Sequence, residues 1–128
     1  MGTVLIAWEL GDGLGHLMQL APIVRGLAAR GHTVFAALRH LGRAEAMFGR
    51  GVSLLAAPWA QTPVERQVLP PVTVAQVLNN MGWHDADHLR SLCGAWRSLY
   101  ALVRPDVVVF DHAPTAMLAS RGLAMKRW

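Results

Sequence analysis

The sequence is poor in cysteine and in long apolar runs. Its single cysteine, Cys93, excludes an intrachain disulfide and cannot build a metal site alone. No segment approaches the roughly 20 unbroken apolar residues that cross a bilayer, so no transmembrane helix is expected. The N-terminus has no basic segment and only a short apolar run, which argues against a signal peptide. We therefore expect a cytoplasmic protein.

Charge is also scarce, because only 16% of the 128 residues are charged whereas 53% are hydrophobic. This apolar content excludes intrinsic disorder, and the length fits a single domain over residues 1–128. The net charge is +4, with eleven arginines and one lysine. Because the arginines are scattered and do not interleave with aromatic residues, no nucleic-acid partner is predicted. A peripheral contact with an anionic membrane stays open.

Hydrophobic periodicity alternates along the chain between two types. Uninterrupted apolar runs, typical of strands buried on both faces, occupy 3–8, 33–38, 52–55 and 107–110. Apolar residues at three- and four-residue steps predict helices near 16–30, 43–48, 74–79, 87–103 and 114–121. This order predicts an α/β fold with a parallel, Rossmann-like sheet covered by helices on both faces.

A glycine-rich loop, Gly11-x-Gly13-x-Gly15, follows the first predicted strand. A dinucleotide-binding loop would have a third glycine where His16 stands, and an acidic residue would end the second strand. Neither condition is met, and no Gly-Lys-Ser/Thr follows the loop. No bound nicotinamide, flavin or ATP cofactor is therefore predicted.

His16 lies in the first turn of the helix that follows this loop. The helix dipole disfavours an imidazolium at that end, so a neutral ring able to accept a proton near pH 7 is expected. Such a histidine in the crevice above a parallel sheet can act as a general base. The residues alone leave a second interpretation equally open, in which His16 only packs against the loop.

Asp111 directly follows the fourth predicted strand. In doubly wound sheets the first and fourth strands are commonly neighbours, so Asp111 and His16 are expected to face each other. A carboxylate on the far ring nitrogen would fix the tautomer of the imidazole. The alternative is that Asp111 caps the helix beginning near Pro114, and both roles could coexist.

His84 and His88 are spaced four residues apart and are accompanied by two aspartates. No third ligand stands at a suitable spacing, and Asp85 or Asp87 is well placed to cap the following helix. No metal site is predicted.

Three segments in order resemble the family 1 nucleotide-sugar glycosyltransferases. They are Gly15-His16-Leu17 with Leu20-Ala21-Pro22, the stretch Leu27–Val34, and Pro105–Pro114. The resemblance implies the N-terminal, acceptor-binding half of a GT-B architecture. It is weakest over about 59–102, where members of that family vary because this region shapes the acceptor pocket.

The resemblance implies an inverting sugar transfer to a hydroxyl of a small apolar acceptor, with His16 as base and Asp111 as its orienter. A UDP- or TDP-sugar would be the co-substrate, without a metal, and its phosphates would lie near Gly13 and Gly15. The implied acceptor contacts are Trp8, Met81, Trp83 and His112.

Members of that family also have a C-terminal domain that holds most of the donor site, and no segment resembling it is expected within these 128 residues. We therefore expect a fragment that is inactive without that domain or a partner chain. The alternative is a non-catalytic or vestigial domain that acts as a protein- or membrane-interaction module.

Overall fold

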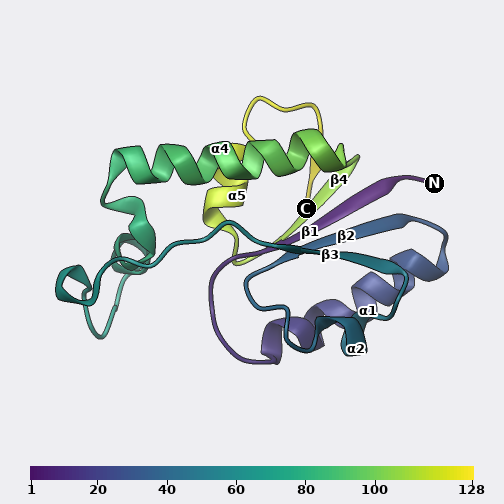
Figure 1. Ribbon diagram of the computed structural model, residues 1–128, viewed down its shortest axis with the longest axis horizontal. Helices are drawn as coiled ribbons and strands as arrows, with labels where there is room; N and C mark the ends of the chain where they lie inside the picture. Colours follow the sequence, from purple (N-terminus) through teal and green to yellow (C-terminus); the bar gives the residue numbers. More distant parts are fainter.

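A computed structural model describes residues 1–128, which form one five-stranded parallel sheet flanked by helices (Figure 1). The strands are β1 (Thr3–Trp8), β2 (Thr33–Leu38), β3 (Val52–Ala56), β4 (Val107–Asp111) and β5 (Lys126–Arg127), in the order β3-β2-β1-β4-β5. Every strand pair is parallel. The predicted α/β class and the adjacency of the first and fourth strands are confirmed.

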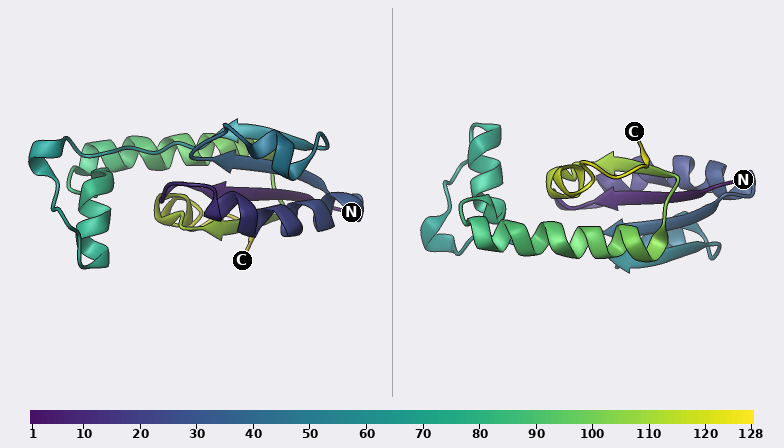
Figure 2. Two further views of the ribbon diagram at one scale, coloured as in Figure 1. Left: turned by 90° about the horizontal axis from the view of Figure 1, so that it is seen from below. Right: turned by 90° about the horizontal axis from the view of Figure 1, so that it is seen from above.

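Helices lie on both faces of the sheet, as Figure 2 shows. The helices α1 (Gly15–Ala29) and α2 (Ala44–Phe48) pack on one face, and α4 (Ala86–Val103) and α5 (Pro114–Ala119) pack on the other. Alternate residues of β1 serve the two layers, because Ile6 and Trp8 belong to the α1 side whereas Leu5 and Ala7 belong to the α4 side.

Local sequence explains where the longest helices begin and end. The apolar stripe of α1 is buried. The helix ends at Ala29 with Arg30 as its C-cap, and the next residue, Gly31, adopts a φ of 82°, which favours glycine. At the start of α4, the Asp85 carboxylate accepts the backbone N–H groups of Asp87 and His88, each at 3.0 Å. The predicted helix cap is therefore confirmed at Asp85.

Residues 57–85, here called the arm, extend beyond the sheet at one end of α4 (Figures 1 and 2). The arm contains a 3₁₀ turn (Val64–Arg66), the helix α3 (Val74–Leu78) and a π-helical turn (Asn79–Trp83). A buried asparagine fastens it: the Asn80 amide accepts Val68 N–H and donates to Val68 C=O, both at 2.8 Å.

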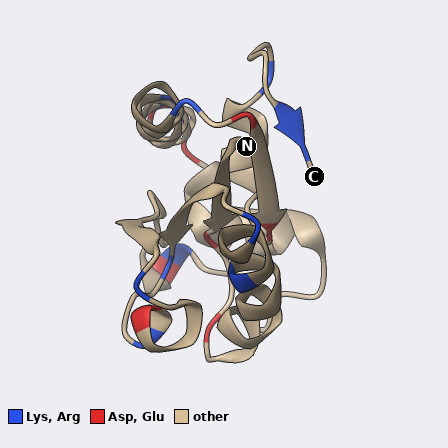
Figure 3. Cartoon of the chain, turned by 90° about the vertical axis from the view of Figure 1, so that its right-hand side faces the viewer, with Lys and Arg blue, Asp and Glu red and all other residues tan.

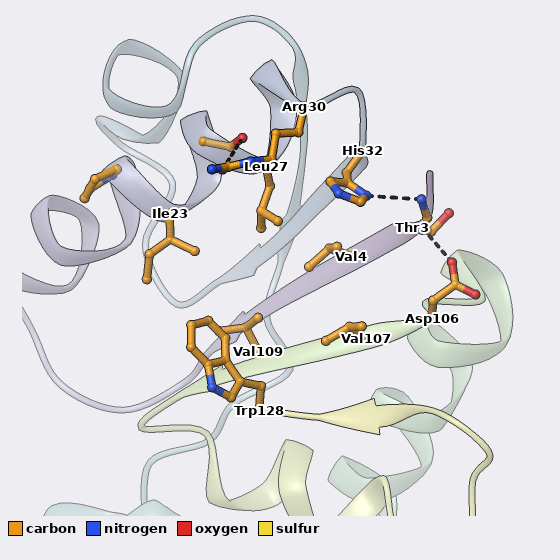
Figure 4. Close-up of a pocket in the computed structure, with 13 residues that line it drawn as sticks. Thr3, Val4, Ile23, Leu27, Arg30, His32, Asp106, Val107, Val109 and Trp128 are labelled. Carbon is orange, nitrogen blue, oxygen red and sulfur yellow. Dashed lines mark hydrogen bonds between the residues drawn. The ribbon is translucent and has the colours of Figure 1, made fainter.

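Two features depart from the sequence prediction. The last helix ends at Ala119, and a two-residue strand, β5, pairs with β4 where no strand was predicted. On the α1 side, a hollow of about 360 Å³ remains beside β4 (Figure 4). Its apolar wall includes Ile23, Val109 and Trp128. The helical cover is therefore incomplete at β4.

None of the helices combines the length and the apolar character needed to cross a membrane.

Candidate active site

The first and fourth strands bring His16 and Asp111 together at their carboxyl ends. Trp8 and Asp111 are register partners in the β1–β4 pair, and the His16 Nδ1 lies 2.8 Å from the Asp111 Oδ2. The side chains are 18% and 10% exposed, so solvent reaches the pair only partly. An ionised carboxylate only accepts hydrogen bonds, so in this pair Nδ1 is the donor and Nε2 is the ring nitrogen left to accept a proton. This is the arrangement that a general base requires.

Trp8 forms the floor of this pair and is fully buried. Its ring stacks on the His16 imidazole with a centroid separation of 4.8 Å and an interplanar angle of 23°. The indole N–H donates to the Leu10 carbonyl at 2.7 Å, which fixes the ring orientation. Trp8 was predicted to contact the acceptor. The structure places it at 0% exposure, where its ring supports His16 from below.

Gly11 lies against the other ring nitrogen of His16. A Cβ at position 11 would overlap the His16 Nε2, and Gly11 has a φ of 94°, which favours glycine. Any side chain at this position would therefore block the atom that is to accept a proton. The sequence shows a glycine here, but its approach to Nε2 becomes apparent only in three dimensions.

Asp111 does not cap the helix that follows it. The N-cap position of α5 is Ala113, which has no side-chain acceptor. Glu9 takes that place: its Oε1 accepts the backbone N–H of Thr115, and its Oε2 accepts the indole N–H of Trp96 at 3.2 Å. Asp111 is thereby left to bond His16.

Glu9 is a residue that sequence analysis missed. It is 1% exposed, and burial raises its pKa to about 7, while the hydrogen bonds from Thr115 and Trp96 oppose that shift. Its position in the sequence could have indicated its burial. Leu5, Ala7 and Glu9 are spaced two residues apart, so Glu9 continues the series of β1 residues that faces α4. An acidic residue that continues an inward-facing series is expected to be buried and bonded.

An apolar hollow of about 580 Å³ opens next to the pair. His112 is the one ionisable residue in its lining, and the ring centroid of His112 lies 5.3 Å from that of His16. The rest of the wall comes from the β4–α5 side and from the arm: Leu10, Phe110, Ala113, Pro114, Met117, Val77, Leu78 and residues 71–74. A largely apolar wall with one ionisable group beside a candidate base is typical of a small-molecule site. Of the four predicted acceptor contacts, only His112 lines this hollow.

Met81 and Trp83 lie outside that lining and hold the base of the arm to the sheet. The Trp83 indole N–H donates to the Thr115 hydroxyl at 3.1 Å. The Met81 sulfur lies 3.9 Å from the Arg39 guanidinium, which itself stacks over Trp59 at 3.8 Å. The structure therefore places both residues as supports, while α3 supplies the pocket wall that sequence analysis assigned to them.

The glycine loop is open to solvent at its outer end. Gly13 and Gly15 are exposed, and nothing lies within 4 Å of a Cβ built on either residue. The first-turn N–H groups of a helix have no acceptor within the helix, so α1 presents donors at this edge. No group of three histidine, cysteine or acidic side chains is close enough to hold a metal ion.

Comparison with known proteins identifies the fold. No protein-family model and no curated protein sequence matches the chain. Among solved structures, it is similar to SsfS6, a glycosyltransferase of Streptomyces sp. SF2575, with a TM-score of 0.62 and 19% identity over 99% of the chain. It is also similar to the glycosyltransferase VinC, solved in complex with dTDP, with a TM-score of 0.50 and 15% identity over 98% of the chain.

The chain therefore shares the fold of the matching part of these two glycosyltransferases. The resemblance of the sequence to GT-B glycosyltransferases is thus confirmed at the level of the fold. The chain spans 38% of the length of SsfS6 and 33% of the length of VinC.

Proposed function

We propose that this glycosyltransferase-like domain binds the acceptor and supplies the base for an inverting sugar transfer. The observation that carries the proposal is the His16–Asp111 hydrogen bond of 2.8 Å beside an apolar hollow of about 580 Å³. The hollow suits a small apolar molecule that bears a hydroxyl, because its wall offers little hydrogen bonding.

In the proposed reaction the Nε2 of His16 removes the proton from the acceptor hydroxyl. The acceptor oxygen attacks the anomeric carbon of a nucleotide-activated sugar, and the bond from that carbon to the diphosphate breaks. Asp111 holds the Nδ1 proton and stabilises the imidazolium that forms. His112, which lines the hollow, would contact the acceptor hydroxyl.

The donor diphosphate is proposed to lie at the open end of the glycine loop. The exposed backbone around Gly13 and Gly15 leads into the positive end of the 15-residue helix α1, and helix N-termini favour anions. The rest of the donor site would come from a further domain or a partner chain, since the compared glycosyltransferases are much longer.

Acceptor binding is tested on the 128-residue chain with 1-naphthol, a flat apolar molecule that carries one hydroxyl, by fluorescence titration. Met117→Asp places a charge on the wall of the hollow and should weaken binding by about tenfold or more. Met18→Asp is the matched control, because Met18 is also an exposed helical methionine but lies outside the lining. Equal effects of the two variants would remove the hollow from the proposal.

The base is tested by turnover of a UDP- or TDP-sugar in the presence of a donor-binding glycosyltransferase domain. His16→Ala should lower turnover by about 100-fold or more, the usual contribution of a positioned base. His32→Ala serves as control, because the His32 side chain bonds the Gly2 N–H at the opposite end of the sheet. Unchanged turnover in His16→Ala would exclude His16 as the base.

A further inference from the structure

Glu9 is a buried carboxylate that the proposed reaction does not use. It is 1% exposed at the end of β1, enclosed between α4 and α5. Burial of an ionisable group is unfavourable unless its hydrogen bonds are satisfied, and both Glu9 oxygens have a donor: Thr115 N–H and Trp96 Nε1–H. An apolar residue in this place would leave both of these buried donors without an acceptor. The carboxylate therefore calls for an explanation beyond packing.

The helix that Glu9 contacts lacks a cap of its own. Ala113 holds the N-cap position without a side-chain acceptor, and Pro114 has no N–H, so Thr115 carries the first free N–H of α5. Glu9 supplies the missing acceptor from β1, a strand more than 100 residues earlier in the chain. Its charge lies at the helix end that the dipole makes positive.

The loop between β4 and α5 is consequently fastened on both sides by adjacent residues of one segment. Leu10 N–H donates to the His112 carbonyl at 2.9 Å, and Glu9 holds Thr115 on the far side. At the first of these anchors, His112 adopts a φ of 41°, a left-handed conformation that is uncommon for residues other than glycine. The loop contains His112 and directly follows Asp111, the last residue of β4.

We propose that Glu9 is a positioning residue, which caps α5 from β1 and so fixes the Asp111–His112 loop against His16. Its catalytic meaning rests on the proposed function, whereas its effect on the loop does not. Glu9 itself is enclosed and touches neither the hollow nor the pair directly, so it acts through Thr115 and the loop backbone.

The charge of Glu9 should change the strength of its hydrogen bonds, and so the rigidity of the β4–α5 loop, in the neutral pH range. Its pKa is raised to about 7 by burial. Two titratable groups of α4, Cys93 and Tyr100, lie close enough for the Glu9 charge to raise their own pKa values, and α5 contributes the N–H groups of Thr115 and Ala116. Arg39 reaches only the Glu9 backbone carbonyl, at 3.0 Å. Protonation removes the charge that strengthens the hydrogen bonds from Thr115 and Trp96. These two bonds are therefore strongest above pH about 7, where burial of the charge itself lowers the overall stability.

The experiment is a pH titration of the 128-residue chain, followed by amide and imidazole NMR signals. In the wild type, the Thr115 amide should shift with a midpoint near pH 7. Glu9→Gln should abolish that step and should shift or broaden the signals of Asp111 and His112. Asp12→Asn, which alters an exposed carboxylate in the next loop, should leave them unchanged. A His112→Gln background removes the titration of the neighbouring ring and should retain the step.

A second variant keeps the test decisive if Glu9→Gln fails to fold. The glutamine amide would turn a donor toward the indole N–H of Trp96, and Trp96→Phe removes that conflict in a double variant. Trp96→Phe alone should retain the step at Thr115 with a higher midpoint, because the charged form loses one hydrogen bond. An identical step at Thr115 with and without Glu9, or unchanged Asp111 and His112 signals in Glu9→Gln, would overturn the proposal.

None of these signals depends on a sugar donor, so the proposal can fail or hold independently of the proposed function. If transfer is established with a donor-binding domain, Glu9→Gln should lower kcat by up to about 100-fold through misplacement of the pair. The KM for the acceptor should change less than kcat, because the arm side of the hollow makes no hydrogen bond to Glu9.

Discussion

The sheet and the arm contribute differently to the same candidate site. The sheet and its covering helices, here called the body, hold His16 in the first turn of α1 against Asp111 at the end of β4, above Trp8, which is 0% exposed. The arm supplies a wall of the hollow, yet Val72 and Val74 in that wall are 79% and 76% exposed. The proposed chemistry thus rests on a packed scaffold, and the shape of the pocket rests on a segment with little apolar burial. Such a division lets the pocket change while the base stays in place.

The largest loss of stability is expected from a substitution in the buried core of the body. Trp96→Ala empties a fully buried site in α4 and removes a hydrogen bond to Glu9, so it should lower the free energy of unfolding by about 3–5 kcal/mol. Trp128→Ala, at a tryptophan that is 73% exposed, should cost much less. Urea denaturation of the two variants measures the difference, and equal losses would contradict the packing described for the body.

The next effect is a pH dependence of the stability of the body. The pKa of Glu9 is raised from 4.5 to about 7 on folding, so the native state binds this proton more tightly than the unfolded state. Stability from this group is therefore complete below pH about 4.5 and lost as the pH rises to about 7, by about 3 kcal/mol. Denaturation across this window should show a fall in the wild type that Glu9→Gln lacks. A parallel fall in both would assign the dependence to other groups.

A smaller and local effect is expected in the arm. Asn80→Ala removes both hydrogen bonds to Val68 and should destabilise the arm by about 1–3 kcal/mol. Hydrogen exchange should rise at Val68 while the amides of β1 keep their protection. Asn79→Ala is the matched control, because the Asn79 side chain makes longer bonds, of 3.2 Å to Arg66 and 3.3 Å to Asn80. Loss of protection throughout the sheet would show that the two regions unfold as one.

The smallest change in stability is expected on the exposed wall of the hollow. Val74→Ser should alter the free energy of unfolding by no more than about 0.5 kcal/mol, because the side chain is 76% exposed. It should nevertheless weaken 1-naphthol binding several-fold. Val64→Ser, at an arm valine that is 73% exposed and outside the lining, should leave binding unchanged. Equal binding by both variants would separate the arm from the pocket.

The body was predictable because its signals are local and repeated. Apolar runs and helical stripes locate β1 to β4 and α1 within one or two residues, and Gly31 marks the end of α1. The meeting of His16 with Asp111 follows from strand order in a parallel sheet. These inferences need periodicity and topology, and no side-chain packing.

The supports of the site were not predictable in the same way. Glu9 reaches Thr115 across 106 residues, and the contact of Gly11 with His16 depends on one backbone angle. Trp8 and Trp83 were recognised as large aromatic residues near the site, but sequence spacing does not say whether an indole faces a pocket or a neighbour. The strand β5 has only two residues, too few for a pattern.

The two outer strands of the sheet differ in what they offer to another chain. At one edge, β5 consists of Lys126 and Arg127, and Figure 3 shows this strand as basic. A short, positively charged edge repels a second copy of itself and discourages pairing between sheets. At the opposite edge, β3 has five residues and no charge. Self-association at high protein concentration should therefore begin at β3, and a charged residue introduced into that strand should suppress it.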